Sequence, residues 1–72
     1  MRNNDEMTKE QVIALIKRII KENKWSQEIA AEQWGISEST LSEVLSGKHS
    51  PGQRLLDALG LEHIDKYRYR RR

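Results

Sequence analysis

The sequence predicts an all-α fold, in which a compact domain of four short helices is followed by a short basic tail. Apolar residues recur at helical spacing after Thr8. Two short segments that each begin with a Ser cap are separated by Gly35, and a Leu-rich segment extends from Pro51 to Gly60. The chain has 72 residues, which is the length of one small domain.

The first helix is expected over residues 9–23. Thr8 and Gln11 have the spacing of a capping box, in which each side chain accepts a hydrogen bond from the other residue's backbone. The apolar residues that follow share one face at helical spacing, and they are Val12, Ile13, Leu15, Ile16, Ile19 and Ile20. We therefore expect one face of this helix to belong to the core and the other to face water.

The second and third helices are expected to be short and joined by a tight turn. Ser26 is a suitable N-cap for the segment QEIAAEQW, and Gly35 suits the left-handed conformation that ends a helix. Ser37 is a second N-cap, for a helix over about 38–45. We expect Trp34 to lie in the core and Trp25 to pack against the start of a helix.

The fourth helix is expected to begin directly after Ser50. Ser50 would cap it, Pro51 would take the first helical position, Gln53 would complete a capping box, and Gly60 would end it. The remaining segment, LEHIDKYRYRRR, has no helical stripe, so we expect it to be strand-like or disordered. The predicted organisation is a domain over residues 1–62 and a basic tail over residues 63–72.

Composition excludes several classes of protein. The chain has no Cys, so it can form neither a disulfide nor a thiolate metal site. No apolar run approaches the roughly 20 residues of a membrane span, and the polar start does not resemble a secretory signal. His49 and His63 are isolated, and no nucleophile–base pair or phosphate-binding Gly loop is present. We expect a soluble cytoplasmic protein that is not an enzyme and needs no metal or cofactor.

The charges are unevenly distributed. The net charge is +2, but the last ten residues carry +4 and residues 1–62 carry −2. Proteins that bind nucleic acid usually have a clustered basic patch. Charge alone therefore gives only weak support for such a partner, and the organisation of the helices is the stronger argument.

The segment from Ser26 to Lys48 resembles the helix-turn-helix motif of the phage repressor and Cro-like family. The resemblance is carried by residues at the expected spacing, namely Gln27, Ala31, Gly35, Ile36, Leu41 and Val44. It extends over about residues 8–69 and implies a lambda-repressor-like domain with its motif at about residues 26–48. It also implies double-stranded DNA as partner, with the third helix in the major groove.

The resemblance and the helical geometry together give candidate DNA contacts. We expect the outward side of the third helix to read bases through Glu38, Ser39, Thr40, Ser42 and Glu43. We expect phosphate contacts from Gln27, Lys48, His49, Ser50, Arg54, Arg68 and Arg70. Many members of the family carry Arg, Lys, Gln or Asn on the reading helix, whereas this chain carries hydroxyls and carboxylates.

Two functional hypotheses follow. The first is a phage or prophage transcription regulator that binds an inverted repeat as a homodimer, because one short helix reads few base pairs. In this hypothesis Ile64, Tyr67 and Tyr69 of the tail contribute to the dimer contact. The second is a protein-interaction module or antitoxin, in which the acidic face of the motif binds a basic partner; the motif carries a net charge of −3.

Overall fold

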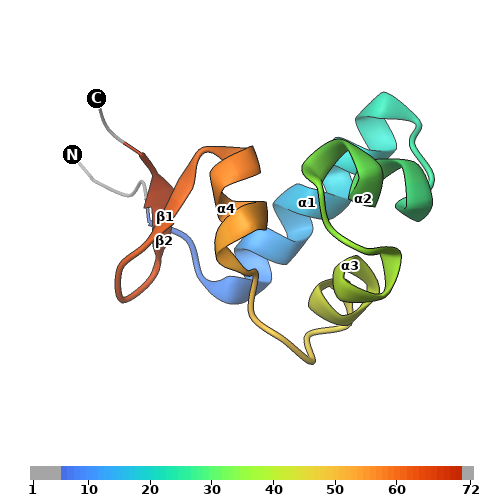
Figure 1. Cartoon of the computed structure of the whole chain (residues 1–72). Coiled ribbons are helices and arrows are strands. Elements are labelled where there is room, and N and C mark those ends of the chain that lie inside the picture. Colours follow the sequence, from blue (N-terminus) through green and yellow to red (C-terminus); the bar gives the residue numbers. More distant parts are fainter. Residues whose placement is uncertain (1–5, 71–72) are drawn as a thin grey trace.

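The computed structural model describes residues 6–70. Four helices are followed by a two-stranded hairpin (Figure 1). The elements in chain order are α1 (Lys9–Asn23), α2 (Gln27–Trp34), α3 (Glu38–Leu45), α4 (Gln53–Leu59), β1 (Leu61–His63) and β2 (Tyr67–Tyr69). The predicted four-helix fold with an extended tail segment is therefore confirmed.

Helix α1 begins with the capping box that the sequence predicts. Both hydrogen bonds of the capping box are present, from the backbone N–H of Gln11 to Thr8 Oγ1 at 3.2 Å and from the N–H of Thr8 to Gln11 Oε1 at 2.8 Å. Lys24 ends the helix in the left-handed conformation, with φ of 58°. The buried residues Val12 and Ile16 lie on the apolar face that the sequence predicts.

Helices α2 and α3 are joined by a turn at Gly35. Gly35 has φ of 71°, and its backbone N–H donates to carbonyls in the last turn of α2. Ser26 and Ser37 cap the two helices, each accepting a hydrogen bond from a backbone N–H in the first turn. The geometry is that of a helix-turn-helix, as the caps and the glycine predict.

The start of α4 differs from the prediction. The helix begins at Gln53 and its N-cap is Gly52, which has no side chain to accept a hydrogen bond. Pro51 is buried and precedes the helix, so Ser50 is not the cap. Gln53 donates forward to Asp57 Oδ1 at 2.8 Å and does not form the expected capping box. Burial of the proline ring thus displaces the helix start along the chain.

The segment after α4 forms a hairpin of β1 and β2. It packs against the helices. Leu61 pairs with Tyr69 and His63 with Tyr67 in the antiparallel register, and the loop between them contains Ile64. The backbone of Met7 adds a bridge on the other edge of β2, through two hydrogen bonds with Tyr67. The expected strand-like segment is confirmed within residues 61–69. Residues 71–72 lie outside the described part of the chain.

The core brings together the inner faces of the helices and two residues of the hairpin. Its buried members are Val12, Ile13, Ile16, Ala30, Ala31, Trp34, Leu41, Val44, Leu55, Leu56, Leu61 and Tyr67. Burial of Trp34 confirms the prediction for that ring. Trp25 meets it edge-on, with the ring centroids 5.8 Å apart and an interplanar angle of 78°. Such T-shaped pairs add to the stabilisation from buried area, by about 0.5–1.5 kcal/mol.

Candidate nucleic-acid interface

Helix α3 presents a polar side to solvent because its apolar side is anchored in the core. Leu41 and Val44 are buried, whereas Ser39, Ser42 and Glu43 are exposed on the opposite side. The outward surface therefore consists of hydroxyls and a carboxylate. Short hydroxyl side chains allow a helix backbone to approach base edges closely, and a carboxylate can accept a hydrogen bond from cytosine N4.

The two flanks of α3 are different. Glu38 lies on the side of α2, and Thr40 lies on the side of α4. The hydroxyl of Thr40 accepts a hydrogen bond from Ser37 Oγ at 2.7 Å, next to the N-cap. Thr40 is thus partly engaged at the start of its own helix, and the central side chains on the outward side of α3 are those of Ser39 and Ser42.

A shallow hollow separates the start of α2 from the outward side of α3. It is lined by Gln27, Glu38, Ser39 and Ser42. Gln27 is half-buried in the first turn of α2, where free backbone N–H groups favour an anion. The structure therefore brings the predicted phosphate contact at Gln27 beside three of the predicted base readers.

The loop after α3 folds back on the last turn of the helix. The carbonyl oxygen of Glu43 accepts hydrogen bonds from the backbone N–H groups of Lys48 at 3.0 Å and His49 at 3.4 Å. His49 Nε2 lies 3.3 Å from Glu43 Oε1, which makes an ion pair when the imidazole is protonated. Lys48, His49 and Ser50 are exposed in the loop after α3. The contact of His49 with Glu43 has no signal in the sequence, because it depends on the path of the loop.

Arg54 lies beside the turn of the motif. A Cβ atom at Gly35 would be 3.6 Å from both Cδ and Nη1 of Arg54. Arg54 and Thr40 line a second hollow between the turn and the start of α4. Arg54 is exposed, and its guanidinium lies near the C-terminal end of α2, where a cation is favourable.

The tail arginines lie away from the motif. Figure 1 shows the hairpin on the far side of α4 from α2 and α3. Arg68 pairs with Glu62 across the hairpin at 2.6 Å, and Arg70 pairs with Asp57 of α4. The structure therefore does not bring these two predicted phosphate contacts together with the others. The hydrogen bond from Arg70 holds the pKa of Asp57 below its ordinary value, with a smaller effect from Gln53.

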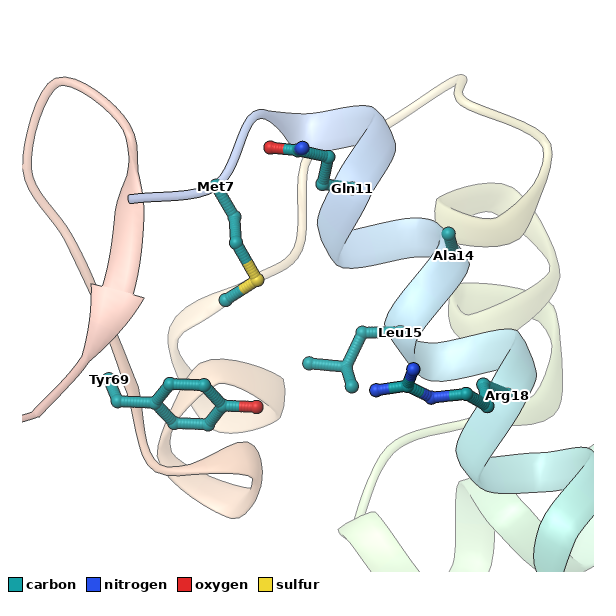
Figure 2. A pocket seen from close by; sticks show the side chains of 6 residues that line it. All are labelled: Met7, Gln11, Ala14, Leu15, Arg18 and Tyr69. Atoms are coloured by element: carbon teal, nitrogen blue, oxygen red, sulfur yellow. The ribbon is translucent and has the colours of Figure 1, made fainter. Parts of the chain in front are cut away.

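An apolar hollow lies between α1 and the hairpin. Figure 2 shows Met7 and Tyr69 on one side and Leu15 and Arg18 on the other. Tyr69 is 52% exposed. Tyr67 is a member of the core, so the expectation that it contributes to a dimer contact is wrong: the hairpin folds back and buries this ring within its own chain.

Two other features of the described residues bear on function. Residues 6–70 contain no group of three or more His, Cys, Asp or Glu side chains that could hold a metal ion. Within the same range, no helix has the length and apolar character needed to cross a membrane.

The fold and the exposed polar helix define a DNA-binding helix-turn-helix protein. Residues 16–60 match the family model described as helix-turn-helix, and the chain belongs to this family, in its Cro/C1-type form. Proteins of this class bind DNA in transcription regulation and are not enzymes. The lambda-repressor-like fold that the motif predicts is thereby confirmed. No curated protein and no solved structure matches the chain significantly.

Proposed function

We propose that this protein is a sequence-specific regulator that binds an inverted repeat as a homodimer, with α3 of each copy in the major groove. The observation that carries the proposal is the exposed polar side of α3, which lies beside the first turn of α2. In helix-turn-helix proteins the second helix of the motif contacts base edges while the first crosses the backbone. The match to the helix-turn-helix family supports DNA as the partner.

Base reading is assigned to the centre of α3. Ser39 and Ser42 offer hydroxyls that donate or accept, and Glu38 and Glu43 offer acceptors for cytosine N4. Thr40 is a contact at the edge. The carboxylates also repel phosphate. We therefore expect a site with few strong contacts, whose affinity depends on the phosphate contacts around it.

Phosphate binding is assigned to groups on both flanks of α3. Gln27 and the N-terminus of α2 lie on one flank, and Lys48, His49, Ser50 and Arg54 lie on the other. Each neutralised phosphate contributes about −0.9 to the slope of log affinity against log salt. Arg68 and Arg70 lie at the hairpin, on the far side of α4 from α2 and α3 (Figure 1), so we do not assign them to this contact.

The homodimer is proposed from the size of the reading surface. A helix of eight residues contacts few base pairs, and a two-fold pair doubles the site at a spacing of about one turn of DNA. Among the tail residues expected in the dimer contact, Tyr69 retains an exposed ring. Sedimentation of the Tyr69→Ser variant tests its part, since an unchanged dimer would exclude it. An origin in a phage or prophage belongs to the same proposal.

A second candidate function is a protein-binding module, and one observation favours it. Ile29 is 42% exposed on α2, and Glu28 and Glu32 are exposed on the same helix. An exposed apolar side chain with two carboxylates to one side of it suits a basic partner that carries an apolar residue. An antitoxin that binds both a toxin and its own operator would combine this surface with the DNA contact.

The test is selection of binding sites from random duplexes, followed by fluorescence anisotropy at two salt concentrations. The Ser39→Arg variant adds a base-reading cation to α3, and Gln33→Arg adds the same charge to an exposed position of α2. We expect the wild type to enrich an inverted repeat, and we expect Ser39→Arg to change the preferred bases. Gln33→Arg should strengthen binding without changing them.

The contrary results are equally specific. If no sequence is enriched, or if both Arg variants change affinity alike and leave the base preference unaltered, then α3 does not read bases in this protein. In that case the surface around Ile29 becomes the leading candidate for its partner.

A further inference from the structure

Helix α3 has no basic side chain of its own at its C-terminal end. The carbonyl groups at the C-terminal end of a helix carry partial negative charge, which a nearby cation stabilises. The last turn of α3 contains no basic residue, and Glu43 adds a negative side chain to it. The reading helix therefore depends on other elements for a positive group at this end.

Lys9 of α1 provides such a group. Its Nζ donates a hydrogen bond to the carbonyl oxygen of Gly47 at 3.2 Å, although the two residues are 38 positions apart. Lys9 is half-buried, whereas Lys17 on the same helix is exposed. A cation in the first turn of α1 is unfavourable for the dipole of α1 itself. The position of Lys9 therefore benefits the end of α3 and not its own helix.

Gly47 follows Ser46, the C-cap of α3. Its φ of 85° lies in the left-handed region, and its N–H donates to the carbonyl oxygen of Val44 at 3.1 Å. Lys48 and His49 follow immediately, and their N–H groups donate to Glu43. A tether at the carbonyl oxygen of Gly47 thus holds the peptide unit from which these two residues extend.

We propose that Lys9 is a positioning residue, which holds the loop after α3 through Gly47 so that Lys48 and His49 face the DNA backbone. This rests on the proposed phosphate contacts of those two residues. Lys9 itself touches no DNA in this account. Lys9 affects binding by ordering the loop after α3, which is distant from it in the sequence but in contact with it in the fold.

The test compares three variants of the full chain. Lys9→Met keeps the apolar stem and removes the ammonium, Lys9→Arg keeps a donor and a charge, and Lys17→Met removes the same charge from the exposed face of α1. Two quantities are measured. The first is hydrogen exchange at the amides of Lys48 and His49 in the free protein, and the second is the salt dependence of affinity for a fixed duplex.

The proposal predicts faster exchange at both amides in Lys9→Met than in Lys17→Met, with exchange close to wild type in Lys9→Arg. It predicts binding about threefold to tenfold weaker than in Lys17→Met and a salt slope shallower by about one phosphate contact. A loss of stability alone would not change the salt slope. Thermal unfolding confirms that each variant is folded at the temperature of measurement.

Equal exchange in Lys9→Met and Lys17→Met would overturn the tether. Faster exchange with an unchanged salt slope would overturn its role in binding. Failure of the proposed function is distinguishable from failure of the tether. If the proposed function fails, the wild type binds no duplex selectively, and the exchange experiment on the free protein still tests the tether.

Discussion

Replacement of Gly35 by Ala tests whether the turn of the motif depends on backbone conformation alone. Gly35 has φ of 71°, and the nearest atoms to an added Cβ are those of Arg54 at 3.6 Å, which is ordinary contact. The methyl group therefore meets no obstacle. The remaining cost is that of a left-handed L-residue, about 1–2 kcal/mol. For a domain of this size, 1 kcal/mol corresponds to a shift of roughly 4–8 °C in Tm.

Thermal unfolding followed by circular dichroism measures this cost. We expect Gly35→Ala to lower Tm by about 4–16 °C. Gly35→Asn should lose less, because Asn tolerates the left-handed region better than Ala. A Gly35→Ala variant as stable as wild type would refute the need for positive φ at the turn. A loss well above about 3 kcal/mol would show that the methyl group meets an obstacle.

Two further predictions concern charges. In Asp57→Asn we expect a weaker dependence of stability on pH in the acid range: the lowered pKa of Asp57 means that its pairing with Arg70 contributes at neutral pH and is lost as pH falls below about 4 and through that lowered pKa. Urea titrations at several pH values measure the free energy of unfolding, and an equal change of this free energy with pH in the two proteins would contradict the prediction. In Glu43→Gln we expect stronger non-specific DNA binding by about twofold to fivefold at low salt, because one repulsive charge is removed from the reading surface. Anisotropy with an unselected duplex measures it, and unchanged affinity would show that Glu43 lies away from the phosphates.

Sequence reasoning succeeded where the signal is local. The capping box at Thr8, the caps at Ser26 and Ser37 and the glycine at position 35 each act within a few residues, and the structure contains each of them. The outward side of α3 also follows from helical spacing around the buried Leu41. These features determine the helices of the motif.

Sequence reasoning failed where distant segments meet. The start of α4 is displaced because Pro51 is buried, and burial depends on the rest of the fold. The sequence suggests Tyr67 for a dimer contact, but its backbone pairs with Met7 and its ring belongs to the core. The tether from Lys9 to Gly47 likewise has no local pattern. Candidate base and phosphate contacts remain predictions, since the structure gives their positions and not their partners.

The surface of α3 explains why charge gave so little indication of function. In the proposed function, the Glu residues of α3 lower attraction to every DNA sequence alike, because their carboxylates repel phosphate. Specific hydrogen bonds to the right bases are then a larger share of the total binding energy. The expected consequence is a regulator with weak non-specific binding for its class and a strong dependence on the flanking phosphate contacts.

The most direct test of the central claim is an NMR titration of the protein with its selected duplex. The account predicts that amide shifts are largest in α3, at the start of α2 and in the loop around Lys48, and small in the hairpin. Shifts confined to the hairpin and the basic tail, with Ser39 and Ser42 unaffected, would contradict it.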